Sequence, residues 1–247
     1  MCTLVILHRP GHDWPLIIAA NRDEMRDRPW SPPARHWPDR PHIMAGRDDL
    51  AGGTWAGIND YGLMAGVLNR TGSLGTDPEH RSRGELPLEA LDHAEAGVAA
   101  AALTDLDPDA YRPFNLFVGD WLEAHWIASD GKDIRAQAVP EGLSMLTDKD
   151  LNDTESPRVR RFLPLFKTAS VPDPETGDWS GWQALMAARL GMDESRDAMN
   201  IETETGFGTV SSSLIAIPKA GNPDIRPVWL FTTGAPHIAP YKSITGL

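Results

Sequence analysis

The first segments of the chain alternate between apolar runs and turn residues. Residues 3–7 and 16–20 are almost wholly apolar, and the segment between them contains Pro10 and Gly11. Continuous apolar runs of this length predict strands that are covered on both faces, and the Pro and Gly predict a turn. The chain is therefore expected to begin with a β-hairpin.

Similar apolar runs, bounded by turn residues, recur along the rest of the chain. They predict further strands at residues 54–58, 63–68, 114–119, 123–129, 142–147, 210–217 and 227–232. The Pro- and Arg-rich segment 26–42 predicts a long irregular surface loop.

Helical patterns occupy the segments between these strands. Residues 86–103 are rich in Ala, Glu and Leu and predict one helix. Residues 157–167 predict a helix broken by Pro164, and residues 179–190 predict a helix that ends at Gly191. Because strands come first, then helices, then strands again, the sheets are expected to be antiparallel and the fold class α+β.

Length and charge narrow the functional classes. The 247 residues contain no linker or internal repeat, so residues 1–247 are expected to form a single domain. The formal net charge of -12 disfavours nucleic-acid binding, and the short basic run at residues 158–161 is interpreted as a solvated surface. No secretory signal and no apolar run of the ~20 residues that span a membrane is recognised, so we expect a cytoplasmic protein.

The lone cysteine, Cys2, directly follows the initiator methionine. Removal of Met1 would leave a chain that starts with a thiol and a free α-amine on the same residue. An α-amine titrates near about pH 8 and can act as base toward its own side chain, and an ionised thiol is a strong nucleophile. The pattern is typical of a catalytic N-terminal nucleophile. The alternative interpretation is that position 2 simply tolerates any small residue.

A polar block at residues 21–24 ends the second apolar run. Buried charges need internal partners, so Asp23 is a candidate acceptor for the α-ammonium, and Arg22 is a candidate for lowering the pKa of the Cys2 thiol. The alternative is a solvated turn after the strand. Asn69 ends the second predicted hairpin, where its amide can donate to a developing oxyanion.

With these features the chain resembles the NRDE-motif family, also called the transport and Golgi organisation 2 family. The resemblance rests on Met1-Cys2-Thr3, on Ala20-Asn21-Arg22-Asp23-Glu24, and on the blocks at residues 52–59, 66–70, 82–84 and 114–120. It implies the N-terminal-nucleophile (Ntn) hydrolase fold, a four-layer αββα sandwich of two antiparallel sheets.

Cysteine amidases of the penicillin V acylase and bile salt hydrolase kind are similar to this chain in the same places. They share the leading Cys, an Asn-x-Asp after the second strand and a later Gly-Leu-Asn. Carried onto this sequence, the resemblance makes Cys2 the nucleophile, lets Asp23 hold the α-amine and lets Asn69 contribute to the oxyanion hole.

The chain departs from these patterns at three positions. The amidases have Arg where this chain has Ala20, but Arg22 lies two residues on, which in a strand is the same face. The amidase Thr-Asn ends in Asp148 here, and a carboxylate cannot donate to an oxyanion unless it is protonated. The family's usual Gly-Thr-Arg-Ser-Ser has Val210 in place of the Arg, so a cation expected near the site is missing.

The remaining candidates concern ligand binding. Asn21, Trp55 and Asp148 are assigned to substrate binding. Four tryptophans are interpreted as packing residues, with an apolar ligand cleft as the alternative: Trp30, Trp37, Trp55 and Trp126. No metal site is expected, because Pro10 and Gly11 separate the only histidines with helical spacing, His8 and His12.

Two functions are compatible with this sequence. The first is an Ntn-type cysteine hydrolase that acts on an amide or thioester with an apolar acyl group and requires no cofactor. The alternative, which the resemblance implies, is a non-catalytic haem or acyl-CoA and lipid binding and trafficking protein on the same fold. In either case the partner is a small acyl or haem-like ligand, with neither nucleic acid nor a membrane span involved.

Overall fold

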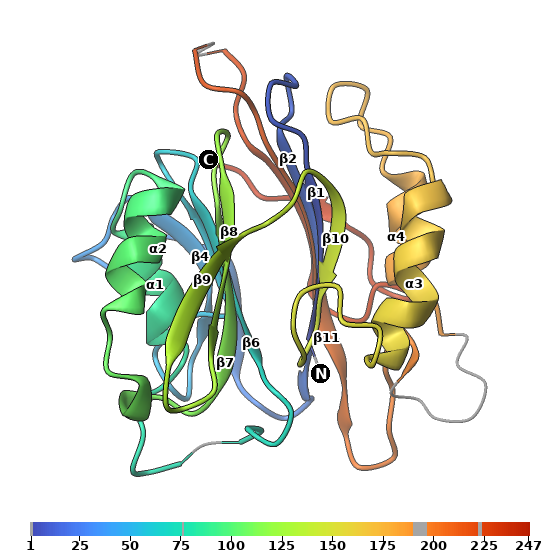
Figure 1. Cartoon of the computed structure of the whole chain (residues 1–247). Coiled ribbons are helices and arrows are strands. Elements are labelled where there is room, and N and C mark those ends of the chain that lie inside the picture. Colours follow the sequence, from blue (N-terminus) through green and yellow to red (C-terminus); the bar gives the residue numbers. More distant parts are fainter. Residues whose placement is uncertain (1, 76, 190–196, 222–223) are drawn as a thin grey trace. The chain divides into compact units, whose positions relative to one another are not determined.

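The computed structural model of the protein describes residues 2–75, 77–189, 197–221 and 224–247. The chain divides into two compact units, one formed by Met1–Arg28 with Pro140–Leu247 and the other by Pro29–Val139. Each unit contains one antiparallel sheet with helices packed on it (Figure 1). The α+β class predicted from the sequence is confirmed. The single domain over residues 1–247 stays a prediction.

The first unit is built on sheet A, in which the described residues form strands in the order β10-β1-β2-β11-β12-β13. The strands are β1 (Thr3–His8), β2 (Leu16–Met25), β10 (Gly142–Leu146), β11 (Phe207–Ile217), β12 (Val228–Thr232) and β13 (Lys242–Ser243). The first predicted hairpin is therefore present as β1 and β2, which pair antiparallel from Thr3 opposite Asn21. β2 also pairs along its whole length with β11, so it lies inside the sheet.

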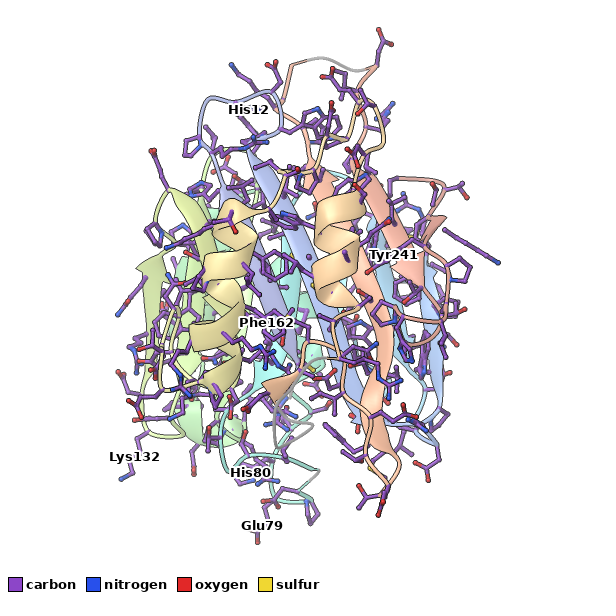
Figure 2. The ribbon with its side chains drawn as sticks, turned by 90° about the vertical axis from the view of Figure 1, so that its right-hand side faces the viewer. His12, Glu79, His80, Lys132, Phe162 and Tyr241 are labelled. Carbon is purple, nitrogen blue, oxygen red and sulfur yellow. The ribbon has the colours of Figure 1, made fainter. Side chains whose placement is uncertain are left out.

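One face of sheet A carries the helices α3 (Pro157–Thr168) and α4 (Ser180–Met186) (Figure 1). Figure 2 looks onto this face, and α3, which carries Phe162, lies in front of the strands in that view. Alternate strand residues such as Val5 and Leu214 pack with Phe162 and Trp182 into one buried cluster. Because strand side chains alternate between faces, every second residue of β1 and β2 belongs to this helix-covered face.

The second unit is built on sheet B, a meander of strands β3 to β9 in chain order. The strands are β3 (Trp30–Ala34), β4 (Ile43–Asp48), β5 (Ala56–Asn59), β6 (Met64–Asn69), β7 (Phe114–Gly119), β8 (Ala124–Ser129) and β9 (Ile134–Ala138). Its helical segments are α1 (Glu85–Leu91), α2 (Ala96–Thr104) and a 3₁₀ turn at Pro108–Ala110. Apolar residues of α1 and α2 form the core of this unit with one face of sheet B.

The structure corrects the interpretation of residues 26–42 as an irregular loop, because β3 (Trp30–Ala34) lies within them. β3 is at the edge of sheet B, and its pairing with β4 is interrupted between Ser31 and Ala34. An edge strand tolerates proline, since the missing backbone donor can face away from the ladder. Strands β4, β9 and β13 were also not predicted.

The single helix predicted at residues 86–103 is wrong, because α1 and α2 are separated at residues 92–95. A side chain at the end of β5 and another just after β7 fix this break. Asn59 Nδ2 donates to the carbonyl oxygens of Leu91 at 2.9 Å and His93 at 2.6 Å. The Asp120 carboxylate accepts from the Ala96 N–H at 2.8 Å, which gives α2 its own start.

The predicted break of the third helix at Pro164 is also wrong, because α3 continues through it. Pro164 lies on the exposed side of α3, so water can hydrate the carbonyl that loses its helical partner. α4 ends at Met186, earlier than residue 190, and the predicted stop at Gly191 lies outside the described residues.

Candidate active site

Cys2 lies at the start of β1, half-buried. Its Sγ donates a long hydrogen bond to the backbone oxygen of Asp23, 3.7 Å away. Since Thr3 pairs with Asn21, the same register places Cys2 opposite Arg22 on the neighbouring strand. Residues opposite each other in an antiparallel pair share a face and lie close enough to interact. The structure therefore brings Cys2 and Arg22 together on the face of sheet A opposite α3 and α4.

Burial raises the pKa of the Cys2 thiol, and the Asp23 carboxylate acts in the same direction. The positive charge of the chain's amino terminus, the backbone hydrogen bond at Asp23 and the positive charge of Arg22 lower it, but burial is the largest influence. A thiol with a raised pKa is protonated at neutral pH. To act as a nucleophile, Cys2 therefore needs a base that removes its proton.

The Asp23 side chain lies on the opposite, helix-covered face of sheet A and is fully buried. Its Oδ2 accepts from Arg158 Nη1 at 3.1 Å, and its Oδ1 accepts from Thr209 Oγ1 at 2.6 Å. The Thr209 hydroxyl in turn accepts from the Ile201 N–H at 2.9 Å, which orients its proton toward the carboxylate. Asp23 is thus held by two donors within the first unit.

Arg158 corrects the interpretation of residues 158–161 as a solvated surface. Its side chain is 1% exposed, at the start of α3, where it pairs with Asp23 and donates to Thr3 Oγ1. Arg158 precedes Phe162 by four residues, so both lie on the buried side of the helix. Arg160 is exposed, as the sequence predicted for the whole run.

Asn21 also faces the helices. Its Nδ2 donates to the carbonyl oxygens of Met186 at 3.0 Å and Met199 at 2.8 Å. Met186 is the last residue of α4, so Asn21 ties β2 to the end of that helix and satisfies one of its unpaired carbonyls. In the block Asn21-Arg22-Asp23, the first and third side chains therefore brace the sheet against helices, and the second lies with Cys2.

The other candidate residues lie elsewhere in the chain. Asp148 is half-buried and follows β10, whose end at Leu146 lies beside the start of β1, so Asp148 belongs to the Cys2 end of sheet A. Asn69 is half-buried at the end of β6, and Trp55 immediately precedes β5; both belong to the second unit. The structure groups Cys2, Arg22, Asp23 and Asp148 in one unit and places Asn69 and Trp55 in the other.

The tryptophans of the second unit have packing partners. The Trp55 ring meets Trp30 edge to face, with centroids 5.7 Å apart, and it lies over Gly46, where a Cβ would come within 2.2 Å of it. Trp37 Nε1 donates to the carbonyl oxygen of Gly52 at 3.2 Å. Trp126 Nε1 donates to the Asn115 side chain at 3.0 Å. These contacts agree with the interpretation of the tryptophans as packing residues.

Two further motif blocks meet at a pair of glycines. A Cβ on Gly53 would come within 2.5 Å of the Gly84 backbone, and the Thr54 N–H donates to the Gly84 oxygen at 2.9 Å. The motif glycines are therefore required by close backbone approach. Val210, which replaces the family's Arg, lies in a bulge of β11 between Thr209 and Ser211.

Sequence reasoning missed Arg158 and Thr209 as site residues. Arg158 carried a usable signal, since its four-residue spacing from Phe162 matches an apolar helical stripe. Thr209 carried only its place in the family's Gly-Thr block, and its contact with Asp23 joins residues 186 positions apart. Among the described residues, no cluster of His, Cys, Asp or Glu is placed to hold a metal ion. Within the same ranges, no helix combines the length and apolarity needed to cross a membrane.

Comparison with solved structures identifies the fold. A mutant of the conjugated bile acid hydrolase from Clostridium perfringens matches with a TM-score of 0.55 and 11% identity, covering 100% of this chain and 97% of that chain. Penicillin V acylase from Agrobacterium tumefaciens matches with a TM-score of 0.52 and 14% identity, covering 94% of this chain and 83% of that chain. At such low identity the likeness shows the fold alone, and it confirms the predicted Ntn-hydrolase-like fold.

Comparison of sequences identifies the family. The Transport and Golgi organization 2 homologues of Mus musculus and Homo sapiens are each 34% identical over 108 residues, which are 42% of this chain. The chain covers only 38% of the length of either relative. The family model for Transport and Golgi organisation 2 matches residues 1–225, and the chain therefore belongs to the Transport and Golgi organisation 2 family.

Proposed function

We propose that this protein is an Ntn-type cysteine hydrolase that cleaves an amide or thioester bearing an apolar acyl group. The observation that carries the proposal is the arrangement at the start of β1. There the Cys2 thiol contacts the Asp23 backbone oxygen and has Arg22 opposite it on the neighbouring strand. A nucleophile at a fixed strand end, next to a cation and an ionisable amine, is suited to acyl transfer.

The proposed reaction begins after removal of Met1. The free α-amine of Cys2 takes the thiol proton, and the thiolate attacks the substrate carbonyl carbon to form a tetrahedral intermediate. The α-ammonium then gives its proton to the leaving amine or thiolate as the bond to the acyl carbon breaks. Water, deprotonated by the same amine, attacks the resulting thioester, which releases the carboxylic acid and returns the proton to the thiol.

The remaining candidate residues take supporting roles in this proposal. Arg22 stabilises the thiolate. The role of Asn69, which belongs to the second unit, stays a prediction from the sequence. Asn21 holds β2 in place through its bonds to the end of α4. Asp148, at the Cys2 end of sheet A, is a proposed substrate contact, and the role of Trp55 stays a prediction from the sequence. The raised pKa of the buried thiol supports the need for a base as close as the residue's own amine.

Two of the solved structures that share this fold are by name a hydrolase and an acylase, which fits the proposed class of reaction. Burial raises the pKa of the Cys2 thiol, and Val210 stands where the family has an Arg. Both features lower the reactivity expected of Cys2 in a chain that keeps Met1, so the proposed reaction requires the removal of Met1.

The test combines intact mass with acyl trapping. The purified full chain is weighed, and it is then incubated with N-octanoyl-p-nitroanilide or with the octanoyl thioester of N-acetylcysteamine. We expect a chain lighter by one methionine that gains one octanoyl group on Cys2, and no gain in a Cys2→Ala variant. Retention of Met1, or equal acylation of the Cys2→Ala variant, would contradict the proposal. Binding of added haem with a Soret band, and no acylation, would favour the carrier alternative.

A further inference from the structure

Arg158 connects helix α3 to both residues that border the Cys2 thiol. Its Nη1 donates to the side chain of Thr3, which follows Cys2 in β1. The same atom donates to the Asp23 carboxylate at 3.1 Å, and the Asp23 backbone oxygen accepts from the thiol. The two charged side chains are 1% and 0% exposed. Water therefore screens these two charges less than it screens charges at the protein surface, so each has a stronger effect on neighbouring groups.

Arg158 donates to one oxygen of the Asp23 carboxylate and Thr209 donates to the other. In the proposed reaction the α-ammonium of Cys2 is a further donor to this carboxylate. A buried carboxylate without a counter-charge would hold that ammonium, and the nearby thiol, in their protonated forms. An arginine keeps its charge at every accessible pH and so neutralises Asp23 permanently.

We propose that Arg158 is a positioning residue that neutralises Asp23, so that the α-ammonium and the thiol of Cys2 can lose a proton near neutral pH. This inference rests on the proposed function, because it assigns the amine and thiol of Cys2 to the reaction. Val210 in β11 replaces the Arg that is usual in the family, and Arg158 from α3 supplies a buried cation in this chain. Asp23, neutralised by Arg158, then orients the chain terminus.

Other charged side chains lie at the same end of sheet A and have the same electrostatic effect on Cys2 in every variant. Arg22 and Glu24 belong to β2, and Asp148 lies in the segment after β10. None of them is changed in the test, so a shift that follows Arg158 and is reversed at Asp23 isolates this one pair.

The test measures the rate of Cys2 alkylation by iodoacetamide against pH in the full chain. Cys2 is the only cysteine, so the intact mass reports its modification alone. We expect Arg158→Met to move the midpoint of the profile upward by about one pH unit or more, because the positive charge paired with Asp23 is removed. Arg158→Lys should restore the midpoint, and so should Arg158→Met combined with Asp23→Asn, which removes both charges.

Arg160→Met is the matched control. It removes a cation from the same helix, but Arg160 is exposed and bonds the Thr154 oxygen, so the midpoint should not move. An unchanged midpoint in Arg158→Met, or a shift that persists after Asp23→Asn is added, would overturn the inference. If Arg158→Met does not fold, Asp23→Asn alone decides the question: it should lower the midpoint, and an unchanged or raised midpoint would overturn the inference.

Alkylation needs no turnover, so the two proposals fail separately. A chain that shows the shift but is never acylated would contradict the hydrolase function and leave the role of Arg158 intact. A chain that is acylated at Cys2 with no shift in Arg158→Met would do the reverse.

Discussion

The buried pair of Arg158 and Asp23 allows a prediction about stability that needs no knowledge of the substrate. Replacing either residue by a neutral one, as Arg158→Met or Asp23→Asn, leaves a charge in a site from which water is excluded. Breaking a buried ion pair by removing one partner costs about 3–5 kcal/mol of unfolding free energy. If the two effects were independent, the unfolding free energies lost by the two single variants would therefore sum to about 6–10 kcal/mol.

The double variant should lose far less than that sum. With both charges absent, Thr209 can still donate to the amide oxygen at position 23, and only the hydrogen bonds made by Arg158 are missing. Each lost hydrogen bond accounts for about 1 kcal/mol, so a total loss of about 2–4 kcal/mol is expected. The coupling energy of the double-mutant cycle should therefore be at least about 2 kcal/mol.

Urea denaturation measures these losses, with circular dichroism following the whole chain. Because the chain has two compact units, hydrogen exchange of peptides from β1 and β11 should be followed in parallel to report the first unit alone. The reasoning is refuted if each single variant loses less than about 1 kcal/mol, or if the effects add to within about 0.5 kcal/mol.

Three further predictions concern other features of the fold. Asn21→Asp should destabilise the first unit by about 3 kcal/mol in urea denaturation, because a carboxylate cannot donate to the Met186 oxygen; an unchanged midpoint would contradict the bracing role. Gly46→Ala should cost about 1–3 kcal/mol in the same assay, since its Cβ would overlap the Trp55 ring, and a neutral result would show that the ring has room to move. Burial raises the pKa of Tyr241 to about 12, above its unfolded value of about 10, so its contribution to stability is complete below about pH 10 and is lost as the pH rises toward 12. Tyr241→Phe should flatten the fall of the urea midpoint over that range, and parallel curves for the two proteins would contradict the assignment.

Much of sheet A and sheet B follows from the sequence because strand patterns are local. The run predicted at residues 114–119 is β7 (Phe114–Gly119), and the first hairpin lies where its apolar runs and turn residues place it. The shared face of Cys2 and Arg22 depends in addition on the register of β1 against β2, because the two-residue period fixes faces only within one strand. β3 was missed because its prolines are acceptable only at an edge, and edge position depends on the whole sheet.

The parts that could not be predicted depend on contacts between distant segments. The break between α1 and α2 is set by side chains at the end of β5 and just after β7, and no local pattern in residues 86–103 indicates it. The partner of Asp23 is 135 residues away in the sequence, so the block at residues 21–24 indicates that a partner is needed but not which residue supplies it. A basic run such as 158–161 is ordinarily solvated, and only its helical phase distinguishes the buried arginine.

The side chains of residues 21–24 point alternately to the two faces of sheet A, and this alternation limits how the chain can vary in length. β2 is paired on both sides, with β1 and with β11, so its register is fixed by two neighbours at once. Inserting or deleting a single residue before the block would exchange its faces, so that Arg22 would meet the helices and the bracing side chains would meet Cys2. Substitutions within the block can be compensated one at a time, but a change of one residue in the length of β2 would disrupt the helix contacts and the nucleophile together.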